Sequence, residues 1–302
     1  MKILCIGNAS YDITLPVSNF PKENTKTRIG TKIECGGGPA SNAAYLLAKW
    51  GIDASFAGVV GNDTYGLKIK EEFEKIGVDT TYLELSKKAK TTESYIIANT
   101  TKATRTILTS KAKNTKYTYN LEKSKDEYDA ILVDGEELEF SIEAINNNKK
   151  ALKMIDAGRV RESTIKLCSL VDYVVCSKDF AENFTNQLID VDDIKSLISV
   201  HQELTKSFNN NVIITLEEKG CFIFDGEYYL VPSIKVKAVD TTGAGDIYHG
   251  ALLYFLVNNY PLYKAAHLAN ITGALSTLTI GGRYSCPDLT DVIERSKKYD
   301  TI

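Results

Sequence analysis

The stretch VDTTGAGDIYHGALLYFLV, residues 239–257, joins the end of a predicted strand, a glycine-rich turn and an apolar helix. Gly243, Ala244 and Gly245 make up the turn, and residues this small let successive backbone N–H groups point to one place. The helix that starts there adds partial positive charge at the same place. The turn is therefore expected to hold an anion, and a phosphate group in transfer suits it.

Asp246 directly follows this turn. A carboxylate in the first turn of a helix is stabilised as the anion, so it is ready to take a proton from a hydroxyl group that attacks the phosphate. An acid that merely caps the helix is the simpler interpretation, and for an isolated G-x-G-D it is the better one. The rest of the chain has to decide between the two.

Short β-branched runs alternate along the chain with stretches of helical apolar spacing. The runs are KILCI, SFAGVV, AILVD, LKMID, YVVCS, NVIITL and CFIF. This alternation predicts β-α-β units and a mostly parallel central sheet covered on both faces, which is a three-layer α/β sandwich. Pro39 and Gly51 mark the expected start and end of one of the helices.

Two regions break the alternation, at about residues 13–34 and 91–119. Thr, Lys and Ile alternate there as in half-exposed strands. Such segments, far apart in the sequence, are predicted to pair into a small antiparallel sheet outside the main body, which would serve as a lid. The expected organisation is thus a single domain, residues 1–302, with a small β-sheet lid.

Composition limits the class of protein. Of the 302 residues, 43% are hydrophobic and 25% are charged, and a net charge of -3 gives no reason to expect nucleic acid. The amino-terminal residues lack the long apolar stretch of a secretory leader, and no apolar run approaches the ~20 residues of a membrane span. A cytoplasmic protein without membrane contact is expected. Six scattered cysteines without a CxxC pair predict reduced, buried thiols.

DTTGAGD, residues 240–246, resembles the carboxyl-terminal signature of the PfkB/ribokinase family of sugar and nucleoside kinases. IGNASYD, GGGPASNAA and GVVGNDTYG follow the family's order in the first 66 residues, so the resemblance covers nearly the whole chain. It implies a ribokinase-like fold and transfer of the γ-phosphoryl group of ATP, with Mg²⁺, to a hydroxymethyl group of a carbohydrate. Asp246 is then the implied general base, and the capping interpretation becomes the weaker one.

The resemblance also implies acceptor-binding residues near the amino terminus. Asp12, Gly38 and Asn42 are implied to hydrogen-bond sugar hydroxyls, with Gly37 beside them. The residue types agree, because glycines let the backbone approach a ligand closely. Taken singly, Asp12 also suits a turn and Asn42 an exposed helix position.

Three arginines have two interpretations each. Arg105 and Arg159 stand where related kinases carry arginines, and each suits either an acidic or phosphorylated acceptor or a surface carboxylate. Arg161 is expected to be a surface residue.

The nucleotide side is implied by weaker matches. The implied ATP-binding residues are Asp179, Thr215, Glu217, Gly220, Asn270 and Gly282. Glu217 replaces a glycine of the family's VTLGxxG motif. VVCSKDFA, similar to the ketohexokinase branch, stands in for the N-x-x-E motif that orders magnesium-bound water, with Asp179 as its acid and Cys176 as a structural residue. Asp240 and the carbonyl of Thr242 are implied to bind a monovalent cation such as K⁺.

Other nucleotide-binding classes fit less well. GNDTYGLK has the glycine spacing of a P-loop, but Leu67 and Lys68 replace its GK[ST] ending. A dinucleotide-binding fold fails because no third glycine follows Gly243 and Gly245. Two alternative functions stay open at this point: a nucleoside kinase of the same fold, and a non-catalytic PfkB-like protein that binds sugar or nucleotide. The formation of a homodimer through the lid also stays open.

Overall fold

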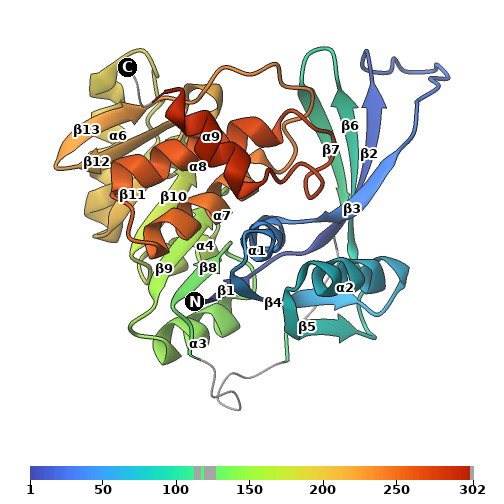
Figure 1. Cartoon of the computed structure of the whole chain (residues 1–302), viewed down its shortest axis with the longest axis horizontal. Coiled ribbons are helices and arrows are strands. Elements are labelled where there is room, and N and C mark those ends of the chain that lie inside the picture. Colours follow the sequence, from blue (N-terminus) through green and yellow to red (C-terminus); the bar gives the residue numbers. More distant parts are fainter. Residues whose placement is uncertain (112–116, 119–126, 300–302) are drawn as a thin grey trace.

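A nine-stranded sheet forms the centre of the computed structural model, which describes residues 1–111, 117–118 and 127–299 (Figure 1). Its strand order is β13-β12-β11-β10-β9-β8-β1-β4-β5. The strands from β11 to β5 in this order are parallel, whereas β12 and β13 are antiparallel. The strands are β1 (Lys2–Ile6), β4 (Asp53–Gly61), β5 (Asp79–Ser86), β8 (Ala130–Val133), β9 (Leu152–Ala157), β10 (Tyr173–Ser177), β11 (Asn211–Thr215), β12 (Cys221–Asp225) and β13 (Glu227–Val231).

Both faces of this sheet are covered, as the apolar runs predict. In β1, Ile3 and Cys5 belong to one hydrophobic core, and Leu4 and Ile6 belong to the other. The first core holds residues of α1 (Pro39–Lys49), α2 (Thr64–Ile76), α7 (Ala244–Val257), α8 (Leu262–Ser276) and α9 (Leu289–Lys297). The second holds residues of α3 (Leu138–Asn147), α4 (Glu162–Cys168), α5 (Lys178–Thr185) and α6 (Ile194–Phe208). The three-layer α/β sandwich is confirmed.

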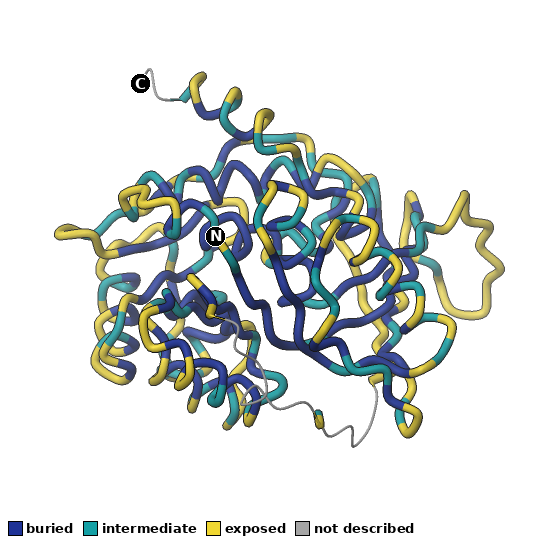
Figure 2. Tube along the Cα trace, turned by 60° about the horizontal axis from the view of Figure 1, so that its bottom comes forward, coloured by how far each residue is buried: buried dark blue, intermediate teal, exposed yellow. Residues whose placement is uncertain are grey.

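Helix α7 lies between two other helices, which explains why it is apolar on nearly all sides. It contacts both α1 and α8, and its residues from Ile247 to Leu253 are buried. Figure 2 shows that the central strands are buried along most of their length. Helix α1 begins at Pro39 and ends just before Gly51, as its start and stop signals predict.

A second, four-stranded sheet stands beside the main body in the order β3-β2-β6-β7 (Figure 1). Its strands are β2 (Ser10–Val17), β3 (Ile33–Gly37), β6 (Thr92–Asn99) and β7 (Thr104–Ser110). Strand β7 is exposed along its whole length. The small separate sheet predicted from the two interrupting regions is thus present.

Two details of this second sheet differ from the prediction. The two regions meet through β2 and β6, which pair in parallel rather than antiparallel. Both strands follow parallel strands of the main sheet, β1 and β5, and leave the same edge in the same direction. Residues 18–32 form no strand, and of the predicted range 91–119 residues 112–116 and 119 lie outside the described residues. Lid movement and a homodimer through this sheet stay predictions.

The cysteines and the helices agree with the expectations from composition. All six cysteines are free and buried. Among the helices of the described residues, none combines the length and the apolar character that crossing a bilayer requires.

Candidate active site

The GAGD turn, residues 243–246, opens helix α7 at the edge where the parallel strands end. Gly243 precedes the helix with φ 75°, a left-handed conformation that glycine adopts without strain. A side chain placed on Gly245 would meet none of the described residues within 4 Å. The helix N-terminus therefore faces open space, with room for a phosphate group.

The carboxylate of Asp246 is fixed by Asn42 from the opposite part of the chain. The Nδ2 of Asn42 donates a 2.8 Å hydrogen bond to Oδ2 of Asp246. Burial raises the pKa of Asp246, while the bond from Asn42 and the nearby side chains of His249 and Arg105 lower it. The Oδ1 of Asn42 is buried without a hydrogen-bond partner in the described structure. The described residues therefore leave one acceptor position of this amide unused.

Asp12 lies within β2, on the same side of the site. Its Oδ1 accepts a 2.9 Å hydrogen bond from the hydroxyl of Ser10, and Ser94 of the neighbouring β6 also bonds its carboxylate. Burial raises the pKa of Asp12 to about 6, and the negative charge of Asp246 makes a smaller contribution in the same direction. A Cβ on Gly37 would overlap this carboxylate, at 2.1 Å from Oδ2. A side chain at this position would therefore displace the carboxylate of Asp12.

Gly38 and Gly282 complete the enclosure around Asn42. Gly38 has φ 101°, and a Cβ there would lie 2.3 Å from the carbonyl oxygen of Asn8. Gly282 faces the amide of Asn42 from the opposite side, since a Cβ on Gly282 would lie 3.4 Å from Nδ2. The structure thus brings together the four predicted acceptor residues, the GAGD turn and Gly282.

Asp240 joins two loops. It accepts a 2.9 Å hydrogen bond from the Thr242 N–H, a 2.7 Å bond from the Thr242 hydroxyl and a 3.0 Å bond from the Gly281 N–H. It thereby fixes the approach to the GAGD turn against the loop that carries Gly282. The carboxylate of Asp240 thus accepts three hydrogen bonds in the described structure, and the binding of a cation by Asp240 and the Thr242 carbonyl stays a prediction.

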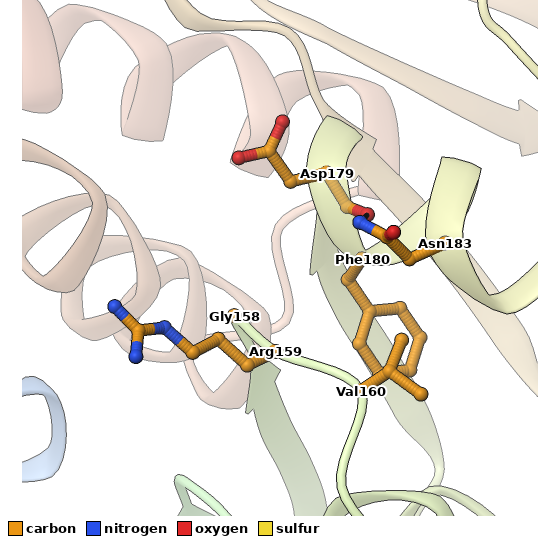
Figure 3. Close-up of a pocket in the computed structure, with 6 residues that line it drawn as sticks. All are labelled: Gly158, Arg159, Val160, Asp179, Phe180 and Asn183. Atoms are coloured by element: carbon orange, nitrogen blue, oxygen red, sulfur yellow. Dashed lines mark hydrogen bonds between the residues drawn. The ribbon is translucent and has the colours of Figure 1, made fainter.

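The three arginines lie in different surroundings. Arg105 of β7 donates from Nη1 to the hydroxyl of Thr241, so it connects the second sheet with the turn before the GAGD sequence. Arg159 lines a pocket with Asp179, whose carboxylate extends from the start of α5 (Figure 3). Arg161 makes a 2.5 Å ion pair with Glu136 and is half-exposed, as expected for a surface residue.

The loop of the predicted nucleotide side has two residues with positive φ, Glu217 and Gly220. Glu217 adopts φ 52°, a left-handed conformation, although it is not a glycine. Gly220 has φ 103°, and a Cβ there would lie 2.1 Å from the carbonyl oxygen of Val231. Thr215 ends β11, and its hydroxyl donates to the Cys176 carbonyl at 3.2 Å. The loop thus places one residue with a side chain in a conformation that favours glycine.

Asn270 is directed into the protein. Its Nδ2 donates a 2.9 Å hydrogen bond to the carbonyl of Val231, and the residue is buried. Its role beside an adenine stays a prediction. The side chain of Cys176 is also buried, which agrees with a structural role.

Several residues of the site carry no recognisable motif. Ser10 and Ser94 hold Asp12, and Thr241 holds Arg105. The alternation of Ser10 with Asp12 places both on one face of a strand, which is the only local sign of their contact. Ser94 and Thr241 become neighbours of the site only through the pairing of distant segments.

A helix N-terminus open to an anion, beside a fixed carboxylate and hydrogen-bonding groups for a hydroxylated ligand, is the arrangement of a phosphotransferase that acts on an alcohol group. A family model described as "pfkB family carbohydrate kinase" matches residues 1–289. The chain belongs to the PfkB family of carbohydrate kinases.

Individual relatives support this membership. A ribokinase of Lactococcus lactis is 25% identical over 309 residues, covering 99% of this chain and 98% of the relative. A nucleoside kinase of Methanocaldococcus jannaschii is 24% identical over 311 residues, covering 99% and 97%. The structure of Arabidopsis thaliana ribokinase complexed with ribose and ATP is 21% identical, with a TM-score of 0.81 and 97% of both chains covered. The chain is thus a sugar or nucleoside kinase with a ribokinase-like fold.

Proposed function

We propose that the chain transfers the γ-phosphoryl group of ATP to a hydroxymethyl group of a sugar, with Asp246 as the general base. The observation that carries this proposal is the contact between Asn42 and Asp246 beside the open space over Gly245. A hydroxyl group that binds the unpaired Oδ1 of Asn42 would lie near both the base and the phosphate position. Positioning of this kind is the main requirement of phosphoryl transfer.

Each part of the site has a separate task in this proposal. Asp12, with Gly37 and Gly38, binds the remaining acceptor hydroxyls. Asp246 takes the proton of the attacking hydroxyl, and the N–H groups of the GAGD turn stabilise the charge on the transferred group. The second sheet excludes water, which would otherwise be a competing acceptor.

Arg159 shares a pocket with Asp179 of the predicted nucleotide side, so we reassign it from the acceptor to the phosphates of ATP. Arg159 and Asp179 line one pocket, and a guanidinium and a carboxylate suit a phosphate and a magnesium-bound water, respectively (Figure 3). Gly220 lets backbone pass where a side chain would collide. When bound, ATP supplies the phosphoryl group and Mg²⁺ neutralises charge on its phosphates.

A nucleoside is the second candidate for the acceptor, because a nucleoside kinase is among the relatives. A base usually requires an aromatic partner on which to stack. Tyr11 does not decide between the two acceptors, because it lies on the opposite face of β2 from Asp12 and stacks on Tyr65 of α2 with ring centroids 4.5 Å apart. The ribokinase relative favours a sugar.

The test is a panel of sugars and nucleosides assayed for ADP formation with ATP and Mg²⁺. The proposal predicts saturable turnover with at least one sugar and a much lower kcat/KM with every nucleoside. A preference for a nucleoside would establish the second candidate. ATP binding without turnover on any acceptor of the panel would instead support a non-catalytic binding protein.

A further inference from the structure

A buried histidine lies directly below the GAGD turn, and the proposed chemistry does not use it. His249 follows Gly245 by one turn of α7 and is 5% exposed. Its Nδ1 lies 2.6 Å from the backbone carbonyl of Gly245 and 3.3 Å from Oδ2 of Asp156. Asp156, at the carboxyl end of β9, is 8% exposed. A buried carboxylate and a buried imidazole thus meet under the candidate active site.

The partners of the ring indicate its protonation state. The second ring nitrogen, Nε2, lies 3.3 Å from the backbone carbonyl of Val175. Backbone carbonyls accept hydrogen bonds and never donate them. An ionised carboxylate does the same, so all three partners of the ring are then acceptors. In a neutral ring only one nitrogen carries a proton and can donate a hydrogen bond. The lone pair of the other nitrogen would then face a carbonyl oxygen, which is unfavourable. A ring protonated on both nitrogens suits all three partners, and the carboxylate of Asp156 balances its charge.

We propose that His249 is a positioning residue of the kinase: its imidazolium ring, held by Asp156, fixes the Gly245 carbonyl and provides the positive charge that keeps Asp246 ionised. The first effect fixes the backbone of the GAGD turn, and the second maintains the base in its active form. This inference rests on the proposed role of Asp246 as the base.

The electrostatic part of this inference has a defined direction. Burial raises the pKa of Asp246, and the charge of His249 opposes that rise. The same charge lowers the pKa of Asp156, which burial raises to about 6. The groups that act on this cluster from the surrounding elements are Asp156 on β9, Cys176 on β10, Tyr248 and Asp246 on α7, Arg105 on β7 and Asp12 on β2. His249 and Arg105 are the cations of this set.

The charge state of the ring can be measured without any turnover. The chain has three histidines, so the ring ¹⁵N spectrum is simple, and the His249→Asn variant assigns one set of signals. The inference predicts that both nitrogens of His249 carry protons at pH 7 in the wild type. It also predicts that the Asp156→Asn variant loses one of these protons at a lower pH. A neutral His249 ring in the wild-type protein at pH 7 would overturn the inference.

The second readout is the pH profile of kcat/KM for the acceptor found in the panel. The His249→Asn variant keeps a donor for the Gly245 carbonyl but has no charge, so the acidic limb should move up by about one pH unit while activity near pH 9 largely recovers. The control is His201→Asn, which changes a buried histidine of α6 bonded to the Val212 carbonyl. Its profile should match that of the wild type. A loss of activity in His249→Asn that is equal at every pH would leave only a packing role and overturn the charge assignment.

These readouts separate the inference from the proposed function. If Asp246 is not the base, its own Asn variant stays active, whatever the state of His249. If His249→Asn does not fold, the His201→Asn and His267→Asn variants assign the His249 signals by elimination, and the ring spectra of the wild type and of Asp156→Asn decide the question.

Discussion

Asn42 donates a 2.8 Å hydrogen bond to Asp246, although 204 positions separate the two residues in the chain. The bond joins the first helix of the fold to the GAGD turn, so the acceptor side and the phosphate side of the site share one contact. The second polar atom of the same amide, Oδ1, is buried and unpaired in the described structure. In the proposed function, Asn42 therefore binds the acceptor and orients the base at the same time.

Replacing Asp12 by alanine should mainly raise the KM for the acceptor, since its hydrogen bonds form in both the ground state and the transition state. The loss of one such bond costs ~1–3 kcal/mol, or roughly 5- to 150-fold. Asn42→Ala should raise this KM as well, but it should also lower kcat because it removes a partner of Asp246. Steady-state kinetics with each substrate varied in turn measures both. A variant that weakens ATP and leaves the acceptor KM unchanged would show that the residue belongs to the other subsite.

Glu217→Gly should stabilise the protein. A residue with a side chain costs roughly 1 kcal/mol in the left-handed conformation that Glu217 adopts, whereas glycine adopts it freely. Glycine also loses more entropy on folding, so the expected net gain in the free energy of unfolding is about 0.5 kcal/mol. Glu218→Gly is the matched control. Glu218 does not have a positive φ, so this substitution should lower the stability of the protein. Urea denaturation of both variants tests this, and an equal loss in both would contradict it.

The raised pKa of Asp134 should be visible in the pH dependence of the free energy of unfolding. Burial raises the pKa of Asp134 to about 7. Because this folded-state pKa is above that of the unfolded chain, the favourable contribution is fully present below about pH 4 and is lost as the pH rises through about 7. Relative to Asp134→Asn, the wild type should therefore gain about 2 kcal/mol in the free energy of unfolding between pH 8 and pH 5.5. A difference that does not change with pH would contradict the raised pKa.

Much of the fold follows from local patterns, whereas the completed site does not. The run KILCI predicts a buried strand because the four residues after Lys2 are all apolar, and its two faces do pack against two cores. DTTGAGD marks the anion site because its chemistry is local. The bond of Ser94 to Asp12, in contrast, depends on the parallel pairing of β2 with β6, and no spacing within either segment encodes that pairing. The antiparallel arrangement was expected for the same reason, since a sequence pattern of half-exposed strands has no direction.

Potassium should raise the activity if a cation binds beside Asp240 and the carbonyl of Thr242. Such a cation would stiffen the loop that already depends on three hydrogen bonds of Asp240. Assays in sodium, potassium and caesium chloride at one ionic strength compare the ions directly. Equal kcat values in all three salts would contradict a functional monovalent cation at Asp240.

The role of Asp246 is tested most directly by kcat of the Asp246→Asn variant. Asparagine keeps the shape of the side chain and is a comparably good residue near a helix N-terminus. The free energy of unfolding, measured by thermal melting, should therefore change by no more than about 1 kcal/mol. The loss of a general base should lower kcat by ~10²–10⁴-fold, with acceptor and ATP still bound. If the folded variant retains more than about a tenth of the wild-type kcat, which is above the range expected for a lost base, Asp246 only caps the helix and the proposed mechanism is wrong.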